Sequence, residues 1–265
     1  MDQSPNRIVQ VVMAILGLVA IFYLYKYLFG TSSQTSTTLI GPKTDAHTDP
    51  NKPIVIPASA LPGLYEGGEF SISMWVYIQN WTYRMGRNKH ILSIGGTNFD
   101  TIRIYLAGNK PQLRARLHTR ASGQVTSDTI SSDNLSKTTY GPLFTQLETD
   151  SGLLDASPLC DLPEIDMQRW VNIVVSLNGK TCDVYMDGKL ARSCVLPTFF
   201  KVDSSYNATL LEYGGFGGYI SAVNMYSSAA TPDQVYHSYM AGPTPITDIG
   251  SYLKSFFEPQ STINV

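Results

Sequence analysis

Alternation of apolar and polar side chains is the feature of this sequence that most restricts its fold. In the segment FSISMWVYI, residues 70–78, one set of alternate positions is entirely apolar (Phe70, Ile72, Met74, Val76, Ile78). Successive side chains of a β-strand point to opposite faces, so this set would line one face, while Trp75 and Tyr77 would lie on the other. The period of two therefore predicts a strand with one face in a hydrophobic core.

Further short runs of this kind follow, and Gly, Pro, Asn and Asp residues separate them. We expect strands in residues 90–96, 101–106, 113–120, 170–177, 182–186, 189–194 and 219–226. Short strands separated by turn residues are typical of an all-β sandwich of two antiparallel sheets. A helix should follow the last strand, because Thr231 suits an N-cap, Pro232 the first helical position and Gly242 the helix end.

The two ends of the chain differ in composition from this central part. Residues 8–25 read IVQVVMAILGLVAIFYLY, and with the flanking residues this apolar run is long enough to cross a bilayer. A cleaved signal peptide is the alternative, but the KYLFG that follows is a poor cleavage site. The prediction is a short N-terminal flank (residues 1–7), a transmembrane helix (8–29) and a flexible linker (30–53). The sandwich (54–242) and a C-terminal helix and tail (243–265) follow.

Charged side chains are segregated along the chain, although the formal net charge is only −2. Residues 84–120 are rich in Lys and Arg, and the following residues, up to 168, are rich in Asp and Glu. On the expected strands, one outer face would carry a candidate basic binding face made of Arg103, Arg114, Arg116, His118 and Arg120. This face would dock an acidic protein, an anionic glycan or lipid head groups, or it would be a solvated face partly neutralised by the acidic segment folded over it. Nucleic acid is disfavoured, because no stacking platform accompanies the basic residues.

Three segments, in order, resemble the concanavalin A-like, laminin-G-like sandwich family. FSISMWVYIQNWTYRMGRNKHILSIGG is similar to the family's opening strands, WVNIVVSLNGKTCDVYMDGKLARSC to its central hairpin unit, and GFGGYISAVNMYSSAATPDQVYHSYMAG to its closing strand and helix. The resemblance covers roughly residues 54–242 and implies a jelly roll of two antiparallel sheets. Because this fold hosts lectins, hydrolases and structural domains, the resemblance implies no single function.

One stretch, PEIDMQRW, invites an enzymatic interpretation. Glu164 and Asp166 resemble the first two positions of the Glu-x-Asp-x-Glu strand of laminarinase-type β-glucanases, whose chemistry needs two carboxyl groups close together. Gln168 stands at the third position and cannot donate a proton as a carboxylic acid does. We therefore expect a solvated acidic loop and no enzyme, and β-glucan hydrolase ranks last among the functions considered.

No cofactor is expected from the sequence, and no metal site can be assigned. The resemblance leaves calcium open, because related domains bind it through loop oxygens. Residues that offer such oxygens are Asp128, Asp133, Asp150 and Asp155.

The cysteines raise a separate question of pairing, because Cys182 and Cys194 flank the turn at Asp187-Gly188. A two-residue turn, which Asp-Gly favours, would send the two thiols to opposite faces of the hairpin and forbid a bond. A three-residue turn would place them directly opposite one another, within bridging distance. Cys182–Cys194 is thus a candidate disulfide, and Cys160 is a rival partner in an oxidising compartment.

Taken together, these features predict a non-enzymatic, membrane-anchored structural or binding module. Its partners would be the lipid bilayer, through residues 8–29, and neighbouring proteins of a shell or surface assembly. The expected setting is the virion of a large DNA virus that contains a membrane, with this chain as a minor capsid protein, or a cell surface. The alternative is a glycan-binding lectin at either surface.

Overall fold

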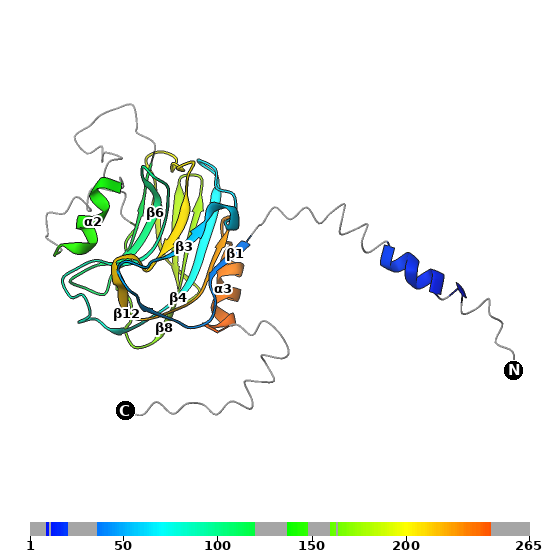
Figure 1. Ribbon diagram of the computed structural model, residues 1–265, viewed down its shortest axis with the longest axis horizontal. Helices are drawn as coiled ribbons and strands as arrows, with labels where there is room; N and C mark the ends of the chain where they lie inside the picture. The colour runs from blue at the N-terminus through cyan, green and yellow to red at the C-terminus, as the bar shows by residue number, and fades with distance from the viewer. Residues whose placement is uncertain are drawn as a thin grey trace, which may run out of the picture. The chain divides into compact units, whose positions relative to one another are not determined.

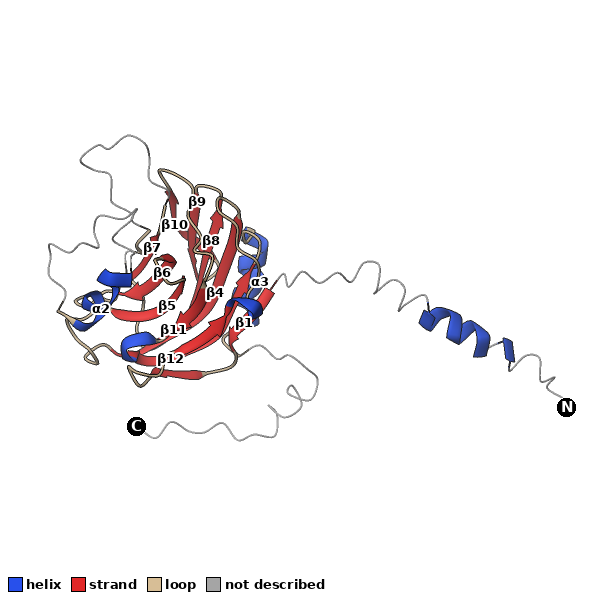
Figure 2. Ribbon diagram, turned by 45° about the horizontal axis from the view of Figure 1, so that its top comes forward, coloured by secondary structure: helices blue, strands red, loops and turns tan. Residues whose placement is uncertain are grey.

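A computed structural model of the chain describes residues 9–10, 12–20, 36–119, 137–147, 160–162 and 164–244. From residue 36 onward the described chain forms two antiparallel β-sheets and few helices (Figures 1 and 2). Side chains from both sheets meet in one hydrophobic cluster. The predicted all-β fold with a two-sheet antiparallel sandwich is confirmed.

The larger sheet, sheet A, has the strand order β1-β12-β4-β8-β9-β10, and β2 also pairs with β12. Its strands are β1 (Ser36–Ile40), β2 (Thr44–His47), β4 (Glu69–Asn80), β8 (Trp170–Asn178), β9 (Thr181–Met186), β10 (Lys189–Val195) and β12 (Gly215–Tyr226). The smaller sheet, sheet B, has the order β3-β11-β5-β6-β7. Its strands are β3 (Ile54–Pro57), β5 (Lys89–Gly95), β6 (Asp100–Leu106), β7 (Leu113–Leu117) and β11 (Asn207–Leu210). Two short 3-10 turns, η1 (Ala58–Ala60) and η3 (Glu212–Gly214), complete the connections.

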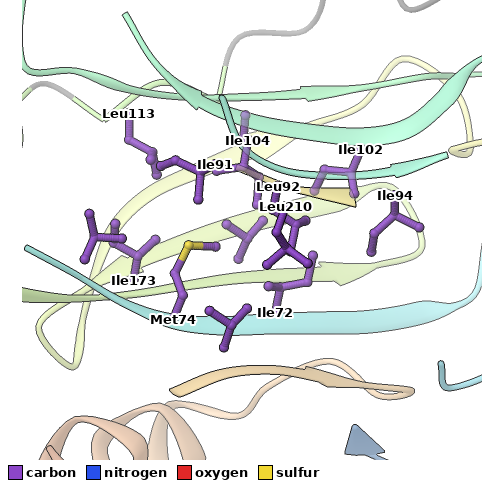
Figure 3. Packing of buried hydrophobic residues seen from close by; sticks show 14 of the residues in the cluster. Ile72, Met74, Ile91, Leu92, Ile94, Ile102, Ile104, Leu113, Ile173 and Leu210 are labelled. Atoms are coloured by element: carbon purple, nitrogen blue, oxygen red, sulfur yellow. The ribbon is translucent and has the colours of Figure 1, made fainter. Parts of the chain in front are cut away.

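The core lies between the two sheets, and β4 supplies its central row. The five alternate apolar residues of β4, from Phe70 to Ile78, are at most 1% exposed. Ile72 and Met74 face side chains such as Ile102 and Ile104 of sheet B (Figure 3). The alternation in the sequence therefore predicted the inner face of this strand correctly.

Two helices cover the outer faces of the sheets. Figures 1 and 2 show α2 (Lys137–Thr145) beside β6 and α3 (Pro232–Ala241) beside β4 and β8. The start of α3 is a capping box, in which the Thr231 hydroxyl accepts from Gln234 N and the Gln234 side chain accepts from Thr231 N. The predicted helix and its ends are thus confirmed, and Val235 packs under it against Val174.

The predicted flexible linker over residues 30–53 is wrong in its second half. Both β1 and β2 lie there and pair with β12, and Leu39, Ile40 and Ala46 are buried. The sandwich therefore begins near residue 36 rather than at residue 54. Backbone pairing with a long strand from the other end of the chain gives structure to a segment that has few apolar side chains of its own.

The N-terminal part of the chain forms a separate unit, Met1–Gln34. Within it, residues 9–10 and 12–20 are helical, and the rest of the predicted span 8–29 lies outside the described residues. In the part of the chain that the structure describes, no helix has the length and apolar character that a bilayer crossing requires. The helix predicted in residues 243–265 also falls almost entirely outside the described part.

The β9–β10 hairpin has the two-residue turn that Asp-Gly favours, with Lys189 opposite Met186. The register then shifts between Leu190 and Arg192, and this irregularity brings Cys194 directly opposite Cys182. Residue Ala191 is the extra one in β10, as in a β-bulge. Turn chemistry fixed the first pair of the hairpin but could not reveal the shift along the strand.

Cys194 is nevertheless bonded to Cys160, with the two Cα atoms 5.9 Å apart, and Cys182 is a buried thiol. The candidate Cys182–Cys194 bond is therefore not formed, and the rival partner, Cys160, pairs with Cys194. Cys160 reaches the hairpin because its chain enters the core beside β9, where its Sγ lies 3.9 Å from the Cys182 carbonyl oxygen. This approach depends on a segment distant in sequence, which local pairing rules do not describe.

Peptide mapping without reductant should recover Cys160 linked to Cys194. Burial, with a smaller contribution from Asp183, raises the pKa of the Cys182 thiol to about 12, so the reactive thiolate is scarce near neutral pH. Iodoacetamide should leave Cys182 unlabelled in the folded protein and label it after denaturation. We expect Cys160→Ser to lower the free energy of unfolding by about 2–4 kcal/mol. Recovery of Cys182 in the linked pair would contradict the assignment.

Candidate functional site

The predicted basic residues share the outer face of sheet B but are buried there. Pairing of β6 with β7 places Arg103 opposite Arg116. The exposed fractions are 0% for Arg103 and Arg116, 5% for His118 and 9% for Arg114. Arg120 lies outside the described residues. The prediction of a solvent-exposed basic surface is therefore wrong at these four residues.

Carboxylates pair with this buried basic set. Arg103 forms an ion pair with Asp100 at 2.8 Å, and both side chains are fully buried. Arg116 binds Asp161, and Arg114 Nε lies 3.9 Å from the same carboxylate. Asp161 belongs to the segment that was expected to fold over the basic face, so the alternative of neutralisation by an acidic segment applies at this point. When a buried ion pair loses one partner, the remaining charge is left without compensation away from water, and the fold is destabilised.

Aromatic side chains complete this buried layer on sheet B. Phe144 of α2 packs edge-on against Tyr105 and His90, with ring centroids 5.6 and 5.3 Å away, and it stacks on Tyr213. Burial raises the pKa of Tyr105, although the nearby Arg116 opposes this effect, so the phenol stays protonated. Through Phe144, α2 thus packs on the outer face of sheet B and covers part of it.

The stretch that resembles a glucanase motif forms a loop before β8, as expected. Glu164 and Asp166 are exposed, and no strand places them on a common face. Asp166 forms an ion pair with Arg169, whose pKa is raised by its hydrogen bonds to Asp187 and Asp166. Among the described residues, no group of three Asp, Glu, His or Cys side chains could hold a metal ion. The four aspartates considered for calcium, at positions 128, 133, 150 and 155, lie outside the described residues.

A pocket lies on the other side of the molecule, between α3 and the outer face of sheet A. Its volume of about 410 Å³ is within the usual range for small-molecule sites. Strands β4, β8 and β12 form its floor, and α3 with the loop before it forms its wall. The described lining residues are Ser71, Ser73, Trp75, Val174, Ala222, Asn224, Tyr226, Ser228, Ala230, Gln234, Val235, His237, Ser238, Ala241 and Gly242. We call this site the α3 pocket.

Strand alternation places the floor of the α3 pocket. Ser71, Ser73 and Trp75 occupy the positions of β4 that alternate with the core residues, so they point away from the core. In β12 the register shifts after Ser221, and Ala222 has a φ of 47° at this irregularity. The sequence predicted that Trp75 lies on the outer face of β4. It did not predict the pocket. The signal in the sequence that could have indicated it is the pair of small residues, Ser71 and Ser73, at the other outward positions of β4.

The lining of the α3 pocket is mainly apolar, with a set of uncharged polar groups. Of the lining residues that the structure describes, none is Asp, Glu, Lys or Arg. Most of the lining surface is apolar, Trp75 adds an aromatic ring, and hydroxyl and amide side chains supply the polar part. Burial raises the pKa of Tyr226, so its phenol remains a hydrogen-bond donor. His237 is 73% exposed and lies at the rim.

Some of these polar groups already have partners within the protein. The Ser71 hydroxyl donates to the Ser228 carbonyl at 2.9 Å, and the Ser73 and Ser238 hydroxyls lie 2.8 Å apart. Asn224 accepts from Thr38. A hydroxyl that donates one hydrogen bond can still accept others, so these side chains keep capacity for a ligand. The arrangement can therefore bind a small polar molecule.

No protein-family model matches the chain, and no curated protein sequence matches it. Among solved structures, the chain is similar to a Trypanosoma rangeli sialidase in complex with 2,3-difluorosialic acid, with a TM-score of 0.50, 12% identity, and coverage of 79% of this chain and 28% of that chain. It is also similar to the ligand binding domain of botulinum neurotoxin serotype D in complex with N-acetylneuraminic acid, with a TM-score of 0.49, 11% identity, and coverage of 77% and 43%. The chain thus spans less than half of either structure. At such identity the likeness to the sialidase extends to the fold alone.

The ion pair between Arg116 and Asp161 can be tested by substitution. Asp161→Asn should lower the free energy of unfolding by about 1–3 kcal/mol, because a buried guanidinium loses a charged partner. Asp166→Asn is the matched control, since Asp166 is 65% exposed and its ion pair with Arg169 should contribute less than about 1 kcal/mol. Urea denaturation measures both changes. Equal effects of the two substitutions would contradict the role assigned to Asp161.

Proposed function

We propose that this chain is a non-catalytic binding module whose α3 pocket accepts a neutral saccharide. The observation that carries the proposal is the lining, which combines uncharged hydroxyl and amide groups with the aromatic ring of Trp75. A sugar ring offers hydroxyl groups that match the first kind of group and an apolar C–H face that packs on the second. Tyr226 and Gln234 are the larger polar side chains available to such a ligand.

A neutral ligand is favoured over an acidic one for a physical reason. Burying a carboxylate is costly unless a cation or several strong donors pair with it. The described lining offers neither Arg nor Lys. The proposed ligand therefore differs from the sialic acid derivatives named for the two similar structures, which carry a carboxylate.

Binding without catalysis is favoured by the same lining. Hydrolysis of a glycosidic bond ordinarily needs two carboxyl groups on either side of the bond. The described residues of the pocket include neither Asp nor Glu. Glu164 and Asp166 lie exposed in the loop before β8 and are not part of the lining.

The setting of the module is a further part of the proposal. The order of the three segments that resemble the concanavalin A-like family supports a jelly roll of that type. The apolar run in residues 8–29 supports a membrane tether, which would hold the pocket near a surface. The virion and cell-surface locations stay predictions from the sequence.

A glycan array that carries neutral and sialylated saccharides tests the proposed function. We expect binding to neutral glycans, with affinity that changes less than about twofold between about 0.05 M and about 0.5 M NaCl, because screening acts on charges. Tyr226→Phe removes one hydroxyl from the pocket and should weaken binding about five- to tenfold.

Tyr236→Phe is the matched control, since Tyr236 is 52% exposed and does not line the pocket. It should leave binding unchanged. A salt-sensitive preference for sialylated glycans, or the absence of binding to any glycan, would refute the proposal.

A further inference from the structure

Tyr239 of α3 covers part of the sheet next to the α3 pocket. Its ring stacks on Trp75, with centroids 5.9 Å apart and an angle of 17° between the planes. On its other side Tyr239 meets the β9–β10 turn, where a Cβ added to Gly188 would lie 3.3 Å from Tyr239 Cβ. The side chain thus lies between Trp75, which lines the pocket, and the turn.

Asn172 of β8 lies between Trp75 of β4 and the β9–β10 turn in the row of residues that runs across these strands. It is paired with Trp75 across the strands, and its backbone carbonyl accepts from Asp187 N at 2.9 Å. Directly paired residues share a face of the sheet, so the Asn172 side chain points outward with Trp75. Tyr239 thus stacks on the residue paired with Asn172 and lies close to the turn that is hydrogen-bonded to Asn172.

The Asn172 side chain is buried but has no hydrogen-bond partner. It is 0% exposed, and neither Oδ1 nor Nδ2 has a partner in the structure. Buried amides almost always have partners, because an unsatisfied polar group in a dry environment is costly. Its neighbours include Val174 and Tyr185, which pack with Val235 in an apolar cluster, and the Asp187 carboxylate, which accepts from the Asn172 backbone N and not from its side chain. The contacts within the protein therefore do not explain why an amide side chain stands at this position.

We propose that Tyr239 occupies a ring-binding subsite that extends the α3 pocket, and that a bound saccharide ring takes its place. In the liganded state the sugar ring stacks on Trp75, and the Asn172 amide accepts from one sugar hydroxyl and donates to another. The inference rests on the proposed function, because the α3 pocket is the entrance through which the sugar reaches Trp75. Tyr239 then competes with the ligand, and the affinity is reduced by the fraction of molecules in which the subsite is filled.

The first test measures thermal unfolding of the full chain without saccharide. Asn172→Leu should keep or raise the melting temperature, because it replaces an unsatisfied amide by an apolar group of similar size. Ser176→Ala, on the same strand face, is the control and should lower it, because the Ser176 hydroxyl accepts from Ala230 N at 2.8 Å. If Asn172→Leu lowers the melting temperature as much as Ser176→Ala does, the amide has a structural role and the proposal fails.

The second test measures binding of methyl α-D-glucoside, methyl α-D-mannoside and methyl β-D-galactoside by saturation-transfer NMR. Tyr239→Ala should raise the affinity for at least one glycoside by about fivefold or more, because the competing ring is gone. Tyr239→Phe keeps the ring and should bind like the wild type, as should Tyr236→Ala on the exposed side of α3. Asn172→Leu should lower the affinity about fivefold or more.

The outcomes separate this inference from the proposed function. If the wild type binds a glycoside and neither Tyr239→Ala nor Asn172→Leu changes the affinity, the pocket binds saccharide and the subsite does not exist. Weaker binding by Tyr239→Ala would make Tyr239 a wall of the site and would also overturn the inference. If neither the wild type nor Tyr239→Ala binds any saccharide, the proposed function and the subsite fail together. Binding by Tyr239→Ala alone would support the subsite.

Discussion

Packing of β4 against sheet B is the interaction on which the rest of the structure depends. Its five inner side chains are almost completely buried, and each such residue contributes about 1.5–3 kcal/mol through removal of apolar surface from water. Because the strand period is two, the same packing fixes where the alternate residues point. Ser71, Ser73 and Trp75 form the floor of the α3 pocket because the residues between them are held in the core.

The outer faces of the two sheets are covered in different ways. On sheet B, charged and aromatic residues form a dense layer in which Arg103 and Arg116 meet carboxylates. On sheet A, α3 packs on Val174 and Tyr185 through Val235 and on Trp75 through Tyr239, and a pocket with several serine side chains remains beside these contacts. Buried charges require fixed partners, whereas uncharged hydroxyl groups can exchange one partner for another. This difference is the reason why the proposed binding site lies under α3 rather than on the basic face.

Local patterns in the sequence predicted the elements that local physics determines. Alternation located the core face of β4 and the outward position of Trp75, and the cap at Thr231 located the start of α3. The strands β1 and β2 were missed, because their stability comes from pairing with β12 and not from their own side chains. Burial of Arg116 against Asp161 and the space under α3 result from contacts between segments distant in sequence. No periodicity in a single sequence encodes such contacts.

The pairing of β12 has a consequence for the order in which the chain can fold. In the described chain β1 and β2 pair with β12 alone. Their partner residues are far away in the sequence, since Ser36 lies opposite Tyr226. During synthesis the N-terminal strands therefore emerge long before their partner exists, and they must wait as unpaired chain. Contacts of such long sequence separation also slow folding, because a large loop has to close before they form. Sheet A and the pocket on it are therefore completed only after β12 and α3 have been synthesised.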